Sequence, residues 1–210
     1  MKNFDNSFLT ENIKLIAGVD EVGRGPLAGP VVAASAIFST DTFIEGVNDS
    51  KKLNEKQREK VLPLIMENAL AYSISVISHG QIDKINILQA SLLAMFTAVS
   101  RLKVTPDLVL ADGNKKFNFS SPVIPVVKGD SKSFSIAAAS IIAKVARDRL
   151  MKRLDAYYPE YLWAKNKGYP TKEHIAAVKL YGPTPLHRKT FLRKILGEQN
   201  ISKKYEIIGE

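Results

Sequence analysis

The chain has 210 residues, of which 45% are hydrophobic, and this size suits one well-filled domain or a domain with a small appendage. It contains no cysteine, which excludes disulfides, thiolate zinc sites and cysteine nucleophiles. It also lacks a run of about eighteen apolar residues and a basic start followed by an apolar run. We therefore expect neither a membrane span nor a secretory signal, and a cytoplasmic location.

The formal net charge is +9, and the positive excess is concentrated toward the C-terminus. Residues 151–210 carry 12 basic and 6 acidic side chains, which is two-thirds of that excess. Such a bias suits a polyanionic partner, because its phosphates release counterions when they are neutralised. A solvated basic surface is the alternative, and charge alone favours nucleic acid only modestly.

Two β-rich runs, residues 13–20 and 30–38, are joined by a glycine turn and predict an antiparallel pair. The first run ends in two acids, Asp20 and Glu21. Neighbours on a strand face opposite ways, so both acids serve one site only if the strand ends or bends there. We expect Gly23 and Gly25 to supply that bend.

The same turn has the composition of a phosphate-binding loop. Gly23 and Gly25 let backbone N–H groups approach a ligand closely, and Arg24 between them adds a forked cation suited to a phosphate. We interpret the stretch as acids for a metal next to a nest for a phosphodiester or a sugar. The alternative is a simple strand, turn and strand with an incidental acidic pair.

The middle of the chain predicts two helices around a third strand. Asn54 suits the cap of a helix over residues 55–68, which Pro63 is expected to kink or split. Residues 70–78 alternate as a strand, and Asn86 opens an apolar helix to about residue 101. Five residues are spaced to cover its buried face: Leu88, Leu92, Met95, Phe96 and Val99.

Two further apolar strands also end in acids. Residues 108–111 lead into Asp112, and residues 123–127 lead into Lys128, Gly129 and Asp130. An Asp-Gly turn or an acid at a helix N-terminus would explain either one alone. Three strands that end in acids are better explained by one site.

An alanine-rich helix follows, and the chain then becomes basic and aromatic. Ser131 and Ser133 suit the cap of this helix, which runs to about residue 157. Thr171 caps a second helix to about residue 181, and residues 186–196 form a basic amphipathic segment. We divide the chain into a catalytic domain, residues 1–157, and a basic helical C-terminal extension, residues 158–210. Its last part, residues 197–210, is predicted to be a mobile tail.

Four carboxylates without cysteine predict a site for a hard cation, Mg²⁺ or Mn²⁺. Two such ions about 4 Å apart can bridge a phosphodiester. Without a cation the acids should repel one another, and the site should show raised pKa values or disorder. Zinc is disfavoured because the three histidines, His79, His174 and His187, have no ligand-like spacing.

Three stretches carry a resemblance to a known family. Residues 18–31, GVDEVGRGPLAGPV, resemble the N-terminal signature of ribonuclease HII, the bacterial type 2 ribonuclease H. Residues 129–131 with 136–149 resemble its second signature. Gly168-Tyr169-Pro170-Thr171, followed by His174 and by residues 187–191, resembles its C-terminal pattern, although that pattern more often has Ser at the position of Thr190. The resemblance covers about residues 14–192.

The resemblance implies a ribonuclease H-like α/β fold, with a five-stranded mixed sheet flanked by helices and a small helical C-terminal extension. It implies that the four acids are catalytic metal ligands: Asp20, Glu21, Asp112 and Asp130. Asp148 is left out because it sits among arginines. The implied substrate contacts are the backbone and side chains of Gly23, Arg24, Gly25, Lys51, Lys128 and Tyr169, of which the glycine loop and the tyrosine read a ribonucleotide followed by a deoxyribonucleotide.

The implied activity is hydrolysis of RNA in RNA/DNA hybrids and of duplex DNA on the 5′ side of embedded ribonucleotides, leaving 3′-OH and 5′-phosphate ends. The implied cofactors are two Mg²⁺ or Mn²⁺ ions, and the implied state is a monomer. An integrase or resolvase of the same fold would share the acids but has no reason to contain the glycine loop. A non-catalytic nucleic-acid-binding module would explain the basic C-terminus but not four converging acids.

Overall fold

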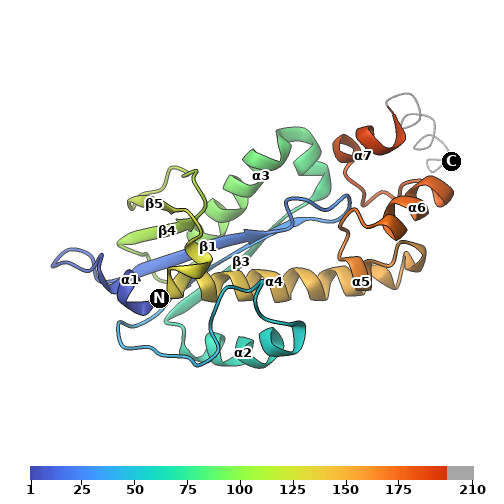
Figure 1. Cartoon of the computed structure of the whole chain (residues 1–210). Helices are drawn as coiled ribbons and strands as arrows, with labels where there is room; N and C mark the ends of the chain where they lie inside the picture. Colours follow the sequence, from blue (N-terminus) through green and yellow to red (C-terminus); the bar gives the residue numbers. More distant parts are fainter. Residues whose placement is uncertain (198–210) are drawn as a thin grey trace. The chain divides into compact units, whose positions relative to one another are not determined.

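The structure, a computed structural model, describes residues 1–197 (Figure 1). The chain forms two compact units. The first, which we call the sheet unit, consists of Met1–Val22, Val32–Val76 and Ser91–Ala146. The second, the helical unit, consists of Gly23–Val31, Ile77–Ala90 and the chain from Arg147 onward. The boundary after residue 157 stays a prediction, and the predicted tail, apart from Gly197, lies outside the described residues.

The elements in chain order are α1 (Lys2–Asn6), β1 (Ile16–Val22), β2 (Val31–Ile37), α2 (Glu55–Asn68), β3 (Ala71–Ile77), α3 (His79–Ser100), β4 (Leu108–Asp112), β5 (Val123–Val126), η1 (Gly129–Ser131), α4 (Phe134–Asp155), η2 (Pro159–Tyr161), α5 (Trp163–Asn166), α6 (Lys172–Tyr181) and α7 (Lys189–Leu196).

The sheet is five-stranded and mixed, as predicted. Its strand order is β3-β2-β1-β4-β5. β1 pairs antiparallel with β2 and parallel with β4, and β4 pairs parallel with β5. The predicted antiparallel pair at the start of the chain is confirmed. Because β1, β4 and β5 run in the same direction, their C-terminal ends share one edge of the sheet.

One face of this sheet is covered by α2 and by the N-terminal part of α4 (Figure 1). Gly18 permits this packing, because a Cβ at that position would lie 2.1 Å from the backbone carbon of Ser135 in α4. The small residues of α4 are buried against the sheet, as expected from their size: Ala137, Ala138, Ala139, Ser140 and Ala143. Ser133 caps this helix by accepting the N–H of Ile136 at 3.2 Å, which confirms that part of the predicted cap.

The predicted cap of α2 is also confirmed, whereas the predicted split at Pro63 is wrong and the kink stays a prediction. Asn54 accepts the N–H of Gln57 at 2.9 Å, and the Gln57 side chain accepts the N–H of Asn54 in return. The helix continues without interruption through Pro63 to Asn68. Its buried side chains, Val61, Leu62 and Ile65, join the sheet core and hold the helix together across the proline.

α3 differs from its prediction in two ways. Asn86, with φ 64° and ψ 166°, interrupts the helix, and its side chain accepts the N–H groups of Leu88 and Gln89. The predicted start is therefore correct for the second piece, but a first piece from His79 was missed. The predicted burial of Phe96 is wrong, since its side chain is 39% exposed and rests at ring distances of about 6 Å from Phe117 and Phe119.

α3 is long and apolar enough to span a membrane by length and composition alone. Its apolar character has a local explanation in the sheet unit. Ser73 and Ser75 of β3 donate hydrogen bonds to the carbonyls of Ala98 and Ala94. Together with the interruption at Asn86, this packing explains the helix as part of a protein core.

The helical unit has its own apolar core. It is built from the glycine-loop residues Leu27 and Ala28, from Met151 at the end of α4, and from residues of the C-terminal helices. Thr171 accepts the N–H of His174 at 3.2 Å and begins α6, and Gly182 ends it, as predicted. α7 corresponds to the predicted last amphipathic segment.

Candidate active site

The predicted acids lie at the shared edge of the sheet. Asp112 is the last residue of β4, and Asp20 lies near the end of the adjacent parallel strand, β1. In that pair Val19 is the partner of Ala111, so Asp20 and Asp112 follow at neighbouring positions. Asp130 lies in η1, just after β5, and its N–H points to the Asp112 carboxylate at 3.4 Å. Three strands thus bring these aspartates to one edge.

β1 does not end at the acids, contrary to the expectation from sequence. It continues to Val22, with Asp20 opposite Ala34 and Glu21 opposite Ala33 on β2. Asp20 and Glu21 therefore leave the strand on opposite faces. The bend comes at Gly23, whose φ of +95° is accessible to glycine at little cost.

Burial and mutual repulsion raise the pKa values of two of these acids. The pKa of Asp20 lies well above its usual range because the carboxyl is buried, and the charges of Glu21 and Asp112 add to the effect. The pKa of Asp112 is raised by burial and by the charge of Asp130. Both observations describe carboxylates that lack enough positive charge around them.

Hydroxyl groups and one lysine are the polar partners of this cluster. The Ser140 hydroxyl hydrogen-bonds to Asp20 and lies 2.8 Å from the Ser50 hydroxyl. Lys51 Nζ lies 2.8 Å from Asp130 Oδ2, and this hydrogen bond raises the pKa of Lys51. Because the Lys51 side chain is 78% exposed, solvent weakens this ion pair.

Lys128 is exposed and precedes η1 in a left-handed conformation, with φ 56°. That conformation aims the next two N–H groups, of Gly129 and Asp130, at Asp112 Oδ1 at 2.7 Å and 3.4 Å. Glycine leaves room at position 129, since a Cβ there would lie 2.6 Å from the end of the Ile136 side chain and 3.1 Å from Asp112 Oδ1. The backbone at residues 128–130 therefore orients Asp112.

The donor set fits a hard divalent cation, although the acids do not form a closed cage. Within residues 1–197, no three acidic or histidine side chains are gathered closely enough to hold an ion as they stand. Carboxylates that repel one another stay apart until a cation compensates their charge. Mg²⁺ and Mn²⁺ prefer oxygen ligands, and the positive charge of such an ion would offset the repulsion that raises the pKa values of these carboxylates.

In the helical unit, two buried arginines fix the shape of the glycine loop, Gly23–Pro30. Arg188 is fully buried and donates to the carbonyls of Gly29 at 3.0 Å, Arg24 at 2.9 Å and Gly23 at 2.6 Å. Burial lowers its pKa to about 9, so it remains a cation near neutral pH. Each of these bonds is charge-assisted, which makes it stronger than a neutral hydrogen bond.

Arg147 holds the other half of the loop. It donates to the carbonyls of Pro30 at 3.0 Å and Ala28 at 3.3 Å, and to the carbonyl of Lys167 at 2.9 Å. It also excludes a side chain at Gly23, since a Cβ there would lie 2.2 Å from Arg147 Nε. The backbone contact from Leu27 N to the Gly168 carbonyl, 2.8 Å long, closes the arrangement.

Tyr169 lies against this loop. A Cβ at Gly25 would be 3.6 Å from Tyr169 Cε1, and the Arg147 guanidinium lies 5.8 Å from the tyrosine ring centroid. Gly25 and Arg24 are exposed and Tyr169 is half-buried, so a ligand can reach this surface. Gly23, Arg24, Gly25 and Tyr169, predicted together from sequence, are thus brought together within the helical unit.

The roles of Arg147 and Arg188 were not predicted from the sequence. Both arginines lie inside the motifs quoted above, which could have indicated a role. An arginine among other basic residues is, however, normally predicted to lie on the surface. The departure at Thr190 is also explained, since its hydroxyl lies 2.5 Å from Asp83 Oδ1 and the same carboxylate accepts the N–H groups of Lys189 and Thr190. Threonine thus provides a hydroxyl for this contact, as serine would.

The remaining predicted positions lie elsewhere. His174 and His187 are buried inside the helical unit, and His79 is half-buried at the start of α3. Asp148, which was left out of the acid cluster, is buried in the helical unit.

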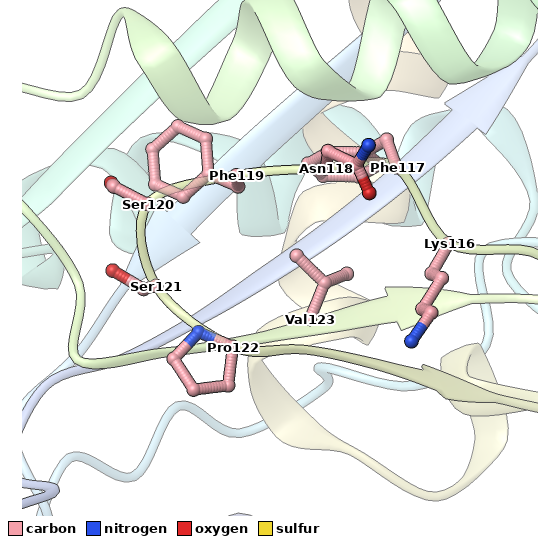
Figure 2. Close-up of a pocket in the computed structure, with 8 residues that line it drawn as sticks. All are labelled: Lys116, Phe117, Asn118, Phe119, Ser120, Ser121, Pro122 and Val123. Atoms are coloured by element: carbon pink, nitrogen blue, oxygen red, sulfur yellow. The ribbon is translucent and has the colours of Figure 1, made fainter.

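One cavity, of about 400 Å³, contains none of the predicted site residues. It is lined by a continuous segment that connects β4 to β5, residues 116–123 (Figure 2). Phe119 points toward α3 from one side of this segment, in keeping with its ring contact to Phe96. We assign this cavity no role.

Comparisons with known proteins agree with these motifs. The family model for Ribonuclease HII matches residues 17–194. A Ribonuclease HII of Ruminiclostridium cellulolyticum is 51% identical over 196 residues, which are 93% of this chain and 77% of that protein. The crystal structure of ribonuclease H2 from Pyrococcus horikoshii OT3 has a TM-score of 0.73 at 31% identity and covers 88% of this chain and 98% of that one. The fold is also that of Bst-RNase HIII, solved in complex with Mn²⁺, with a TM-score of 0.59, 20% identity and coverage of 95% and 72%.

Proposed function

The chain belongs to the ribonuclease HII family and is a metal-dependent endoribonuclease that acts on RNA/DNA hybrids, and we propose how its residues divide this work. In our proposal the edge of the sheet holds the divalent ions, and the glycine loop with Tyr169 reads the ribonucleotide. The metal ligands are the four acids: Asp20, Glu21, Asp112 and Asp130. The ions are Mg²⁺ or Mn²⁺, two of them with substrate bound.

The observation that carries the first part is the uncompensated negative charge at the sheet edge. Asp20 and Asp112 have raised pKa values in the absence of a cation, and the charges of Glu21 and Asp130 are among the causes. When bound, divalent ions supply an activated water and charge stabilisation at the phosphodiester and the leaving oxygen. The chain's contribution is to hold the ligands at one edge and to orient them through Ser140 and the Gly129 N–H.

Two lysines near these acids are proposed to contact the substrate backbone. Lys51 forms an ion pair with Asp130 in this structure. In our proposal a metal ion replaces the lysine at Asp130, and the exposed Lys51 side chain then moves to a phosphate of the substrate. Lys128 is exposed beside the backbone that orients Asp112. Both lysines would position the duplex by charge and carry no sequence information.

The second part of the proposal concerns selection of ribonucleotides. The 2′-OH distinguishes RNA from DNA, and backbone groups of Gly23, Arg24 and Gly25 can hydrogen-bond it. The Tyr169 ring, packed under Gly25, would stack on the sugar or base of the next nucleotide. We also propose cleavage on the 5′ side of a ribonucleotide in duplex DNA, with 3′-OH and 5′-phosphate products, as the family resemblance implies. We further propose a monomeric, cytoplasmic enzyme.

The test is cleavage of a labelled DNA duplex that contains one ribonucleotide, with Mg²⁺, with Mn²⁺ and with a chelator, beside an all-DNA duplex and an RNA/DNA hybrid. We expect metal-dependent nicking 5′ to the ribonucleotide and no cutting of the all-DNA duplex. Cutting of the all-DNA duplex would refute the role of the glycine loop. Binding without cleavage in either metal would favour a non-catalytic nucleic-acid-binding module.

A further inference from the structure

A buried hydrogen-bond chain in the helical unit ends at the backbone of Tyr169. Its members are Trp163, His174, Thr184 and His187, of which the two histidines and the tryptophan are at most 1% exposed. Their rings pack against one another, with 5.3 Å between the histidine ring centroids and 5.5 Å between Trp163 and His187. Buried imidazoles are stable only when each ring nitrogen has a suitable partner, so the direction of each bond can be worked out.

The chain begins at Thr184. Its backbone N–H lies 2.9 Å from His187 Nδ1, and an amide N–H can only donate. His187 Nδ1 therefore carries no proton. A neutral imidazole has one N–H, so the proton of His187 is on Nε2, which lies 3.1 Å from His174 Nε2.

Trp163 independently fixes the next step. Its indole Nε1–H, also a donor only, lies 3.1 Å from the same His174 Nε2. His174 Nε2 is thus an acceptor shared by two donors, and the proton of His174 must be on Nδ1. That Nδ1–H lies 2.9 Å from the carbonyl oxygen of Tyr169 and donates to it.

The environment keeps both rings neutral. Burial lowers the pKa of His174, and burial together with His174 lowers the pKa of His187 to about 3. The geometry agrees with this state, because a second proton on His174 would be on Nε2 and would face the N–H groups of Trp163 and His187. A second proton on His187 would be on Nδ1 and would face the Thr184 N–H, with only the Thr184 hydroxyl, 2.9 Å away, able to accept it. The direction of every bond in the chain is therefore fixed.

The last acceptor of this chain is the backbone of a proposed specificity residue. The Tyr169 carbonyl also accepts the N–H of Thr171 at 2.8 Å, so both of its lone pairs are used. Pro170 restricts the conformation of Tyr169 to the extended region. With its carbonyl held and its backbone restricted, the tyrosine has its ring placed below Gly25 before any substrate arrives.

We propose that His174 is a positioning residue for ribonucleotide selection: locked as the Nδ1–H tautomer by Trp163 and His187, it holds the Tyr169 backbone so that the ring presents a preformed surface to the nucleotide beside the ribonucleotide. The inference rests on the proposed function of Tyr169 and adds a group that does not touch substrate. It assigns a function to His174 and His187, which the sequence placed in the C-terminal family pattern and disfavoured as zinc ligands.

The structure offers a matched pair of substitutions at this position. In His174→Asn the amide nitrogen can occupy the place of Nδ1 and still donate to Tyr169. In His174→Gln the amide group reaches the place of Nε2 and leaves the Tyr169 carbonyl without its side-chain donor. His79→Gln, at a half-buried histidine outside the chain of bonds, controls for the change of residue type. Trp163→Phe removes the indole donor from the chain and also leaves a smaller ring at a fully buried position, so its kinetics are compared only if a thermal melt shows that the variant is folded.

The readout is the ratio of kcat/KM on a DNA duplex with one ribonucleotide to kcat/KM on a continuous RNA/DNA hybrid. A displaced reading group costs about 10-fold or more in rate, so we expect His174→Gln to lower this ratio by about 10-fold. We expect His174→Asn and His79→Gln to stay within about 3-fold of the unchanged protein, and Trp163→Phe to lie between. Equal ratios for the Asn and Gln variants would overturn the positioning role.

Tyr169→Ala separates failure of this inference from failure of the proposed function. If Tyr169→Ala lowers the ratio and His174→Gln does not, the inference alone is wrong. If Tyr169→Ala leaves the ratio unchanged, the tyrosine does not select the substrate, and both are wrong. The double variant should be no worse than Tyr169→Ala, because His174 acts only through the tyrosine.

A measurement on the unchanged protein keeps the inference testable if the variants do not fold. Long-range ¹H–¹⁵N NMR distinguishes the two neutral tautomers of histidine. We expect His174 as the Nδ1–H form and His187 as the Nε2–H form throughout the neutral pH range. The opposite tautomer at His174, or an imidazolium at either residue, would overturn the proposed chain of bonds.

Discussion

The two groups of proposed site residues are held in opposite ways. In the sheet unit, carboxylates share one edge, raise one another's pKa values and form no closed cage within the described residues. In the helical unit, the glycine loop and Tyr169 are tied down by Arg147, Arg188 and His174 through bonds to backbone carbonyls. The acids need a partner to complete them, whereas the loop is complete without one.

This difference follows from what each group must bind. A bound metal ion can offset the electrostatic repulsion between its carboxylate ligands, because the charge of the ion is the largest in the site. A 2′-OH brings only one donor and one acceptor, and a weak partner cannot organise a flexible loop. A site that reads a hydroxyl must therefore be built beforehand, and buried cations under a backbone loop are one way to build it.

The largest expected effect is loss of a metal ligand. Asp20→Asn should reduce cleavage by about 10³-fold or more, because charge stabilisation by a bound ion contributes several kcal/mol to the transition state. Duplex binding should survive, since the glycine loop and the basic residues are unchanged. Single-turnover cleavage and a binding titration check both statements, and a variant that still turns over normally would remove Asp20 from the metal site.

Substitution of Arg188, which binds the carbonyls of the glycine loop, should lower the stability of the folded protein. Arg188→Met leaves the carbonyls of Gly23, Arg24 and Gly29 without their donor, which should cost about 3–5 kcal/mol of unfolding free energy. Tm should fall by about 10 °C for a chain of this size. The matched control is Arg193→Met at an exposed position of α7, which should change Tm by no more than about 2 °C.

Two glycine-to-alanine substitutions in the glycine loop distinguish an effect on substrate binding from an effect on stability. Gly25→Ala places a methyl group 3.6 Å from the Tyr169 ring, an ordinary contact, so the fold should be retained. The same methyl would cover the surface proposed to meet the ribonucleotide, and kcat/KM should fall by about 10-fold. Gly23→Ala, which meets Arg147 at 2.2 Å, should instead lower Tm. Unaltered kinetics in folded Gly25→Ala protein would place the ribonucleotide elsewhere.

The acids should also make the stability depend on pH. Folded Asp20 and Asp112 hold protons more tightly than the unfolded chain does, so the folded state binds more protons. The contribution of these acids to the free energy of unfolding should therefore decrease as pH rises from about 4 through the raised pKa values. The buried histidines, whose pKa values are lowered, contribute the opposite slope below about pH 6.5, so the test is the difference between the unchanged protein and Asp20→Asn. Urea unfolding of both metal-free proteins from about pH 5 to about pH 8 measures this difference, which Mg²⁺ should reduce, and an equal slope in the two proteins would contradict the repulsion.

The smallest effect is expected at Lys51. Its exposed ion pair with Asp130 is worth at most about 1 kcal/mol, so Lys51→Gln should lower Tm only slightly without metal. The stabilisation by added Mg²⁺ should be larger than in the unchanged protein, because the ion no longer competes with the lysine for Asp130. Thermal melts with and without Mg²⁺ give the difference, and a smaller metal response would mean that Lys51 assists the metal.

Much of this organisation could be predicted from the sequence. Strand periodicity with turn residues located all five strands, and Asn54 and Thr171 marked the starts of their helices because caps are local. The exposure of Phe96 could not be predicted, because it depends on Phe117 and Phe119 in a later loop. The continuity of α2 through Pro63 depends on its packing against the sheet core, which local propensity does not contain.

The parts of the site that depend on local sequence could also be predicted, and the parts that depend on tertiary packing could not. Acids at the ends of strands could be recognised because strand ends share an edge, and the glycine loop was recognised by its motif. The roles of Arg147 and Arg188 depend on partners far away in sequence, such as Gly23, which lies 165 residues from Arg188, whereas His174 bonds the Tyr169 carbonyl only 5 residues away. Their partners are backbone carbonyls, which every residue has, so no pairing of side-chain types could reveal them.

Hydrogen exchange with and without Mg²⁺ tests the central difference between the two regions most directly. The amides of Leu27, Gly29 and Tyr169, which are bonded within the helical unit, should exchange slowly without metal and should not change when it is added. The amides of Gly129 and Asp130, which are bonded to Asp112, should exchange faster without metal and slow markedly with it. Equal protection of both regions in metal-free protein, or slowing of the loop amides by the metal, would contradict the account.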